Sequence, residues 1–366
     1  MKVLIDDGLS TLQETGGIYN QSINLWKHLR TLIQCDITDY HYLKTFPRVA
    51  RRAVYLGLTN LGPHQRQYDL IHYQNYYVPR SRGKAKGVTT IHDLAGLKSP
   101  DVYPAWYNAY FRRTLHQALV RSDAMITVSN AIRKQLLDAF PHMDESRVHV
   151  CYNGLRSVFF ESRPVEEELD AIGLRPYSYF LCVGNLEVRK NLPFLLLQFA
   201  EARKRSLIAK DTKLVLVGQE GIGFKSFQHQ ISERDQIFRL GRISDEQLVT
   251  LYRFCKAFLF PSLYEGFGIP ILEAMSQGAP ILISNIPASL ELHRRHNSRC
   301  FVFELDRKEM LAEMLSHLDQ NSAHIADRLD YGDLTLYSYD HVAQEHVRIY
   351  AQILNGSKYG MLPKRT

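Results

Sequence analysis

The chain has 366 residues, of which 45% are hydrophobic and 23% are charged, and a formal net charge of +7. This length suggests two domains, each able to bury its own core, and the composition is typical of a soluble globular protein. We see no charged-then-apolar leader and no apolar run near the roughly 20 residues that span a bilayer. We therefore expect a cytoplasmic protein without a secretory signal.

The five cysteines are scattered and odd in number, and no two form a C-x-x-C pair. This pattern fits a reducing compartment and predicts neither a disulfide framework nor a zinc site. The sequence also contains no repeats and no low-complexity tract.

The positive charge lies in the first half of the chain. Residues 1–155 hold 19 of the 45 Lys and Arg and 12 of the 38 Asp and Glu, whereas the remaining residues sum to zero. A basic half favours a polyanionic partner, such as an anionic membrane surface or a nucleic acid. A solvated basic surface explains the charge equally well. Because no aromatic RNA-recognition motif is present, we do not expect nucleic acid to bind.

The first predicted elements are a strand at residues 1–6, a loop with Gly16 and Gly17, and a helix over residues 20–32 with apolar residues at helical spacing. The loop does not match the G-x-G-x-x-G fingerprint of dinucleotide-binding proteins.

Basic and aromatic residues interleave over residues 41–56. From Arg48 onward, with Arg51 and Arg52, the pattern fits a basic amphipathic helix, which is typical of binding to a membrane surface. A solvated helix is the alternative. A second basic run over residues 80–86 is interpreted as a surface loop.

A strand predicted over residues 88–94 reaches His92 and Asp93 at its end. In doubly wound folds, ligands bind at the carboxyl ends of parallel strands. A His-Asp pair in such a place is often only structural, so the pair alone predicts little.

The second half begins with a strand at residues 179–184, followed by Arg189 and Lys190 and by a helix from Leu192, for which Asn191 is the predicted N-cap. Two cations at a helix N-terminus suit a pyrophosphate. An exposed Arg-Lys pair is nevertheless common at helix starts.

The richest stretch runs from an apolar strand at residues 257–260, through a glycine-rich loop with Glu265, to a helix with Glu273 about one turn inside it. Backbone N–H groups and the helix dipole make such a loop a phosphate site. Helix periodicity can turn the Glu273 side chain toward the same end of the strand as Glu265. Carboxylates accept hydrogen bonds from neighbouring hydroxyls. The pattern fits a nucleotide sugar, although a surface loop with two solvated glutamates would explain an isolated pair.

This stretch resembles the signature region of the retaining glycosyltransferases of the GT-B fold, family 4, often called group 1. The matching pieces are Pro261–Gly268, Pro270, Leu272–Met275, Gly278–Pro280, Ser284-Asn285 and Glu291. The resemblance covers nearly the whole chain. It implies an α/β fold of two doubly wound, Rossmann-like domains facing a cleft, and transfer of a sugar from a nucleoside diphosphate sugar with retention of configuration.

The resemblance also implies roles for single residues. Glu265 would contact the transferred sugar, His92 would lie near the reaction centre, and Lys190 with Arg189 would bind the leaving diphosphate. The implied donor-binding residues are Gly16, Gly17, Gly184, Asn185, Arg242, Ile243, Gly266, Phe267, Gly268, Ile269 and Glu273, the last at the ribose. Many family members have an arginine where Asn185 stands, so one expected phosphate contact is replaced here.

We expect an acceptor-side domain at residues 1–155 with a closing helix at about residues 338–366, a linker at 156–175 and a donor domain at 176–337. The chain has no D-x-D motif, so we expect neither a metal nor another cofactor, and the donor is the co-substrate. No side chain is an obvious nucleophile; Glu265 would be the default candidate, but the resemblance implies that it binds sugar hydroxyls. The route we expect is departure of the leaving group and arrival of the acceptor on one face, with the leaving phosphate oxygen accepting the acceptor's proton. The resemblance favours GDP-mannose and a glycan or lipid-linked acceptor, with peripheral contact to an anionic membrane at its inner face. The alternatives are a sugar-nucleotide epimerase on the same fold and a nucleotide-sugar-binding protein without turnover.

Overall fold

A computed structural model describes residues 1–7, 17–38, 67–79, 83–98, 102–296, 299–307, 309–321 and 329–356. The chain divides into two compact units, unit 1 (Met1–Gly154 with Thr335–Thr366) and unit 2 (Leu155–Leu334). The predicted linker at 156–175 instead belongs to unit 2, because its short helices bury Phe159 and Leu169. None of the described helices is both long and apolar enough to cross a bilayer.

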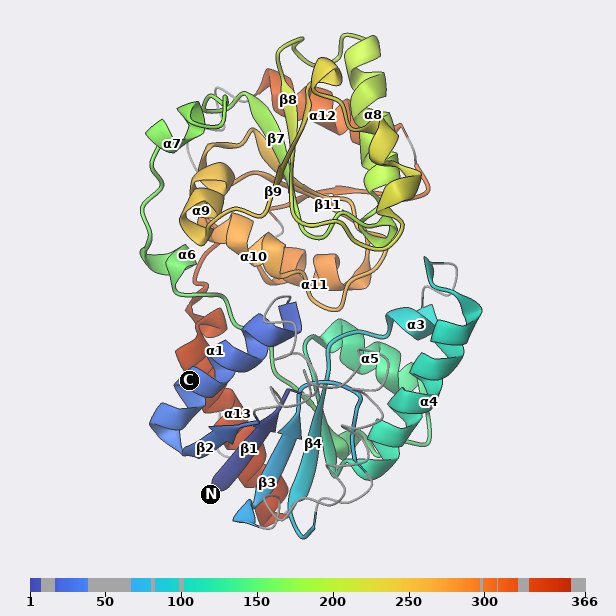
Figure 1. The fold of residues 1–366 in the computed structure, drawn as a ribbon, viewed down its shortest axis with the longest axis vertical. Coiled ribbons are helices and arrows are strands. Elements are labelled where there is room, and N and C mark those ends of the chain that lie inside the picture. Colours follow the sequence, from blue (N-terminus) through green and yellow to red (C-terminus); the bar gives the residue numbers. More distant parts are fainter. Residues whose placement is uncertain are drawn as a thin grey trace, which may run out of the picture. The chain divides into compact units, whose positions relative to one another are not determined.

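In the described part of unit 1, six parallel strands form one sheet in the order β2-β1-β3-β4-β5-β6 (Figure 1). Its elements are β1 (Lys2–Asp6), α1 (Gly17–Leu32), β2 (Gln34–Ile37), β3 (Leu70–Tyr73), β4 (Lys86–Ile91), α3 (Ala95–Lys98), α4 (Ala105–Arg121), β5 (Ala124–Thr127), α5 (Asn130–Ala139), β6 (Val148–Val150) and α13 (Tyr339–Asn355).

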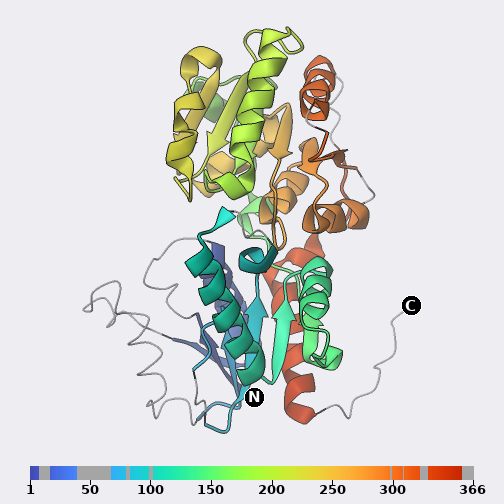
Figure 2. The ribbon, with the colours of Figure 1, turned by 90° about the vertical axis from the view of Figure 1, so that its right-hand side faces the viewer.

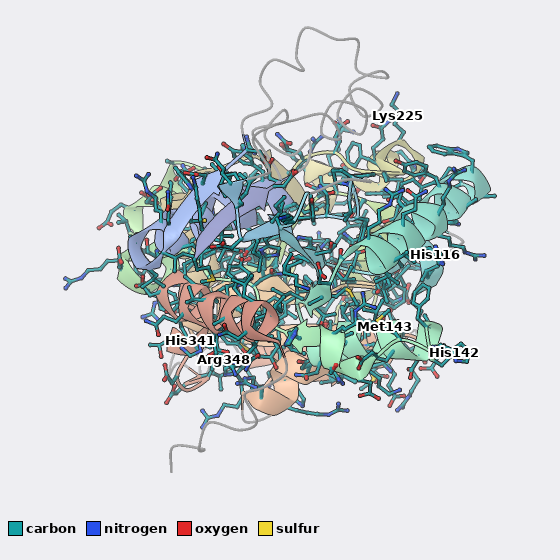
Figure 3. The ribbon with its side chains drawn as sticks, turned by 90° about the horizontal axis from the view of Figure 1, so that it is seen from below. His116, His142, Met143, Lys225, His341 and Arg348 are labelled. Atoms are coloured by element: carbon teal, nitrogen blue, oxygen red, sulfur yellow. The ribbon has the colours of Figure 1, made fainter. Side chains whose placement is uncertain are left out.

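The two faces of this sheet have separate cores because strand side chains alternate. On β1, Val3 and Ile5 pack with residues of α1 and α13, whereas Leu4 packs with Ala118 of α4 (Figure 2). The closing helix α13 is thus part of the unit 1 core, and its exposed side carries His341 and Arg348 (Figure 3).

In the described part of unit 2, six parallel strands follow the order β12-β11-β10-β7-β8-β9. Its elements are α6 (Val158–Glu161), α7 (Glu167–Asp170), β7 (Tyr179–Val183), α8 (Leu192–Lys204), β8 (Lys213–Val217), β9 (Ile237–Gly241), α9 (Asp245–Phe254), β10 (Ala257–Phe260), α10 (Ile269–Ser276), β11 (Ile281–Ser284), α11 (Pro287–Arg295), β12 (Phe301–Phe303) and α12 (Met310–Gln320).

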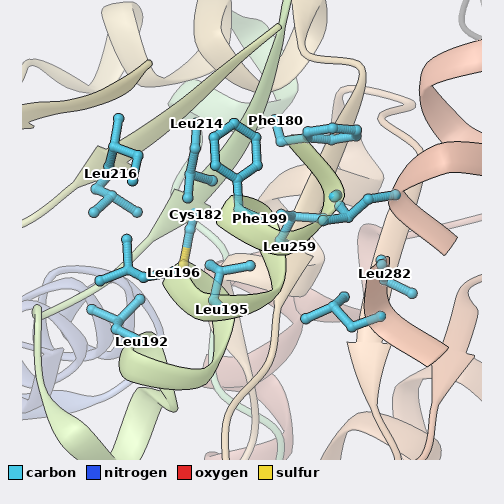
Figure 4. Close-up of a cluster of buried hydrophobic side chains, with 14 of the residues drawn as sticks. Phe180, Cys182, Leu192, Leu195, Leu196, Phe199, Leu214, Leu216, Leu259 and Leu282 are labelled. Carbon is cyan, nitrogen blue, oxygen red and sulfur yellow. The ribbon is translucent and has the colours of Figure 1, made fainter. Parts of the chain in front are cut away.

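Alternation again separates two cores in unit 2. Phe180 and Cys182 of β7 pack with leucines of α8 and with α12 in one buried cluster (Figure 4). The Tyr179 hydroxyl, on the other face of the sheet, donates to the Leu251 carbonyl of α9 at 2.8 Å. Helices on both faces make unit 2 a doubly wound domain, as predicted.

The chain order of the strands reverses between β7 and β10, which are direct neighbours in the sheet. In unit 1 the corresponding reversal lies between β1 and β3. In open α/β sheets, ligands bind outside the carboxyl ends of the strands at such a reversal. This places the candidate site of unit 2 in the segments that follow β7 and β10.

Candidate functional site

The segments after β7 and β10 are joined directly. The Leu263 N–H donates to the Arg189 carbonyl at 2.9 Å, and Arg189 Nη1 donates to the Tyr264 carbonyl at 2.9 Å. The sheet reversal therefore brings Arg189, Lys190 and Glu265 into one place, as expected for residues of a shared site.

A buried ion-pair cluster lies where the segments after β7 and β10 meet. We call it the Glu265 cluster (Glu187, Arg189, Lys190 and Glu265). Lys190 Nζ lies 2.6 Å from Glu265 Oε1, and Arg189 Nη1 lies 3.0 Å from Glu265 Oε2. Arg189 Nη2 also contacts Glu187 Oε1 at 2.8 Å. The Glu265 side chain is 10% exposed. Two cations and two carboxylates thus share a site that is nearly closed to water.

The protonation state of Glu265 follows from these neighbours. Burial alone would raise the pKa of Glu265, but Lys190 and Arg189 outweigh burial and hold this pKa at about 2. The carboxylate is therefore ionised at neutral pH and can accept, but not donate, hydrogen bonds.

The Lys190 side chain lies close to the Gly184 backbone, where a larger residue would crowd it. A Cβ atom at Gly184 would lie 3.3 Å from Lys190 Cε, and the residue has a φ of +137°. A Cβ at Gly218 would lie only 1.9 Å from the Gly184 carbonyl oxygen, so the two backbones pass in close contact. Asn185 is exposed beside them.

The glycine-rich loop ends in the predicted helix. Gly268 occupies the N-cap of α10 with a φ of +109°, and Pro270 lies in the first turn. Ile269 opens the helix, and Gly266 and Phe267 are buried just before it. The first N–H groups of a helix have no intrahelical partner and suit an anion.

The start of α8 differs from its prediction. Asn191 does not cap the helix through its side chain, and its backbone is left-handed, with a φ of 57°. Arg189 and Lys190 precede α8, as predicted, and lie in a 3₁₀ turn (Val188–Lys190). The tight turn points both cations back toward Glu265.

Glu273 has partners of its own. Arg156 Nη2 donates to Glu273 Oε1 at 3.1 Å, and the Tyr252 hydroxyl donates to Oε2 at 3.0 Å. Burial raises the pKa of Glu273, and Arg156 acts against that rise. Neither Arg156 nor Tyr252 was predicted as a site residue, because Arg156 lies where the sequence indicated a linker and Tyr252 fits an ordinary apolar helix face.

The nucleobase residues expected from the resemblance lie between β9 and α9. Arg242 is exposed and Ile243 is half-buried. Ser244 then starts α9 with a capping box, in which its hydroxyl accepts from the Gln247 N–H and the Gln247 side chain accepts from the Ser244 N–H. The cap fixes the turn that carries both residues.

In unit 1, His92 and Asp93 follow β4. His92 Nε2 lies 2.9 Å from the Gln74 carbonyl, and since a carbonyl only accepts, this nitrogen carries the proton. Burial lowers the pKa of His92, so the neutral ring presents Nδ1 as an acceptor. Asp93 Oδ1 accepts from the Ala95 N–H and starts α3. Gly17 is the exposed first residue of α1, and Gly16 lies outside the described residues.

The segment 48–56, predicted to meet a membrane, also lies outside the described residues. Among those that are described, no group of three or more His, Cys, Asp or Glu could hold a metal ion.

Comparisons with known proteins address the family and the fold of the chain. Residues 166–330 match the family model of the glycosyl transferases group 1, and residues 36–157 match that of glycosyltransferase family 4. The O-antigen chain mannosyltransferase B of Escherichia coli is 31% identical over 233 residues, which are 61% of this chain and 58% of that protein. The chain thus matches less than two thirds of that relative's length.

Two solved structures share the fold over nearly the whole chain. The sucrose-phosphate synthase of Thermosynechococcus elongatus has a TM-score of 0.77 at 16% identity, covering 97% of this chain and all of that one. Anabaena HepE, solved in complex with UDP and glucose, has a TM-score of 0.73 at 19% identity, covering 96% of this chain and 100% of that one. The predicted GT-B fold of two doubly wound α/β domains is confirmed.

Proposed function

Because the chain belongs to the group 1 and family 4 glycosyltransferases, we propose that it transfers a sugar from a nucleoside diphosphate sugar to a glycan or lipid-linked acceptor, with retention of configuration. The observation that carries this proposal is the Glu265 cluster at the reversal of the unit 2 sheet. It combines cations for a leaving diphosphate with an ionised acceptor for sugar hydroxyls.

Each member of the cluster would have a distinct task. Lys190 and Arg189 would stabilise the negative charge that grows on the leaving diphosphate, and the α10 N-terminus would add to this effect. Glu265 is held by both cations, so it is poorly suited to attack the sugar. This supports departure and arrival on one face, with the leaving phosphate oxygen taking the proton of the acceptor hydroxyl.

Glu273 would receive the ribose, and His92, with its acceptor Nδ1, would face a donor-sugar hydroxyl. The proposed preference for GDP-mannose rests on the mannosyltransferase relative, whereas HepE holds UDP. We further propose that no metal is needed, since Lys190 and Arg189 would supply the positive charge that a metal provides in other transferases.

The proposal is tested by calorimetry with GDP-mannose, UDP-glucose and dTDP-rhamnose, followed by incubation of each bound donor without acceptor. A transferase binds one donor class and hydrolyses it slowly. An epimerised sugar would favour the epimerase, and binding without any turnover would favour a nucleotide-sugar-binding protein. A chelator should leave the rate unchanged.

We also propose peripheral contact with an anionic membrane. The exposed side of α4 carries Trp106, which is 71% exposed, together with Arg112, Arg113 and His116, and the helix contains no acidic residue. His116 is labelled in Figure 3. Such a surface combines an aromatic anchor with charges that attract anionic lipid. Residues 48–56, for which the sequence predicts the same kind of contact, lie outside the described residues.

A further inference from the structure

Both carboxylate oxygens of Glu273 already hold one hydrogen bond each. Arg156 donates to Oε1 and Tyr252 donates to Oε2, and the Glu273 side chain is 7% exposed. A carboxylate oxygen has about two lone-pair positions. One acceptor position therefore remains on each oxygen.

The two donors are themselves held in place. Arg156 forms a second ion pair with Asp245, the first residue of α9, and its guanidinium lies 5.1 Å from the centre of the Phe159 ring. The Tyr252 ring packs edge-on against Phe159 and Phe258 at 6.2 Å and 5.2 Å. The orientation of the Glu273 carboxylate is thus set before any ligand arrives.

A ribose presents two adjacent hydroxyls, and a carboxylate with one open acceptor position on each oxygen matches such a diol. We propose that Arg156 and Tyr252 are positioning residues that hold the Glu273 carboxylate in the orientation that receives the ribose hydroxyls of the donor. This inference rests on the proposed function, in which Glu273 receives the ribose.

The charges around Glu273 explain how Arg156 affects the pKa of this carboxyl group. The carboxylate is buried, which raises its pKa, while Arg156 and Tyr252 lower the pKa and Asp245 raises it. Without Arg156, the carboxyl takes up a proton at a higher pH than in the wild type. The protonated form loses an acceptor and binds the diol less well, so the loss of affinity grows as the pH falls.

The test compares Arg156→Gln with the wild type by calorimetry, using GDP and UDP and their 2′,3′-dideoxy counterparts. Weakening a charge-assisted hydrogen bond at the ribose should reduce the affinity for the ordinary nucleotide about tenfold. The dideoxy nucleotide should bind both proteins equally. Arg156→Lys should restore part of the affinity, and the deficit of Arg156→Gln should increase as the pH is lowered.

Two further variants keep the result interpretable. Tyr252→Phe retains the ring packing and removes only the hydroxyl. It should therefore lower the affinity for the ordinary nucleotide and leave the affinity for the dideoxy nucleotide unchanged. Arg203→Gln removes an arginine at the far end of α8, where its Nη1 donates to the Lys210 carbonyl, and should change the binding of neither nucleotide.

Equal weakening of ordinary and dideoxy nucleotides by Arg156→Gln and by Tyr252→Phe would overturn the inference, because both residues would then be structural. Equal binding of the two nucleotides by the wild type would also overturn it, while leaving donor binding intact. A wild type that binds neither GDP nor UDP would contradict the proposed function itself.

Discussion

Lys190 Nζ and Glu265 Oε1 lie 2.6 Å apart, and each residue follows a different one of two neighbouring strands in the unit 2 sheet. Lys190 also lies over the Phe260 ring, 5.0 Å from its centre. The cation is therefore held by a carboxylate and an aromatic face, and it keeps further N–H donors for a phosphate. This relationship underlies the predictions below.

Replacing Lys190 with alanine should reduce turnover far more than it affects folding. A contact that strengthens as the leaving phosphate gains charge contributes about 3 kcal/mol, which corresponds to a loss of about 100-fold or more in rate. The measurement is kcat/KM with the preferred donor, alongside the melting temperature. Lys204→Ala, on the exposed side of α8, is the matched control. Kinetics like those of the wild type in soluble Lys190→Ala would remove Lys190 from the site.

Replacing Glu265 and replacing Glu273 should give different kinetic defects, because the two residues would contact different parts of the donor. Glu265→Ala should mainly lower kcat, by about 100-fold, because its carboxylate would touch the sugar that changes shape. Glu273→Ala should instead raise the donor KM by about tenfold, as the loss of uniform binding does. Steady-state kinetics of both variants decide the matter. A defect in KM alone for both would show that these roles are wrongly assigned.

The acid stability of the protein should depend on Glu265. The folded-state pKa of about 2 lies below the ordinary value of 4.5, so the stabilising contribution is present above about 4.5 and is lost as the pH falls toward 2. Melting temperatures measured across that window should fall more steeply for the wild type than for Glu265→Gln. Parallel curves would mean that the ion pairs with Lys190 and Arg189 contribute little to stability.

Membrane contact should be sensitive to charge and to salt. Cosedimentation with phosphatidylglycerol vesicles should exceed that with phosphatidylcholine vesicles. Both Trp106→Ser and the triple replacement of Arg48, Arg51 and Arg52 by Glu should weaken binding to phosphatidylglycerol vesicles. For the triple replacement the expected loss is roughly 1 kcal/mol per basic residue. Donor hydrolysis should not change.

A matched triple replacement of Arg203, Lys204 and Lys210 by Glu in unit 2 should leave vesicle binding intact. Equal sedimentation with both kinds of vesicle, or none at low salt, would favour a soluble acceptor.

Much of unit 2 was predictable because its signals are local. The apolar runs at β7, β8 and β10 and the Gly268–Pro270 helix start depend on neighbouring residues only. The contact of Arg189 with Glu265 spans 76 positions and arises from the pairing of β7 with β10, which no local pattern contains. The resemblance assigned both residues to donor binding but did not predict their ion pair.

Other features could not be predicted for physical reasons. Arg156 lies in a charged, proline-containing stretch that is typical of linkers, and its role appears only when α9 and α10 bring Asp245 and Glu273 beside it. Asn191 is a good N-cap residue type, yet the tight 3₁₀ turn before it imposes a left-handed backbone, which asparagine tolerates better than most residues.

The configuration of the sugar released from its donor in the absence of acceptor distinguishes retention from inversion and reports on Lys190 in the same experiment. Proton NMR should follow the first minutes of hydrolysis of GDP-mannose, or of whichever donor calorimetry selects. We predict that the first free sugar has the same anomeric configuration as the donor and that Lys190→Ala releases it about 100-fold more slowly. First release of the opposite anomer, or equal rates for the two proteins, would contradict a retaining transferase whose leaving group is stabilised by Lys190.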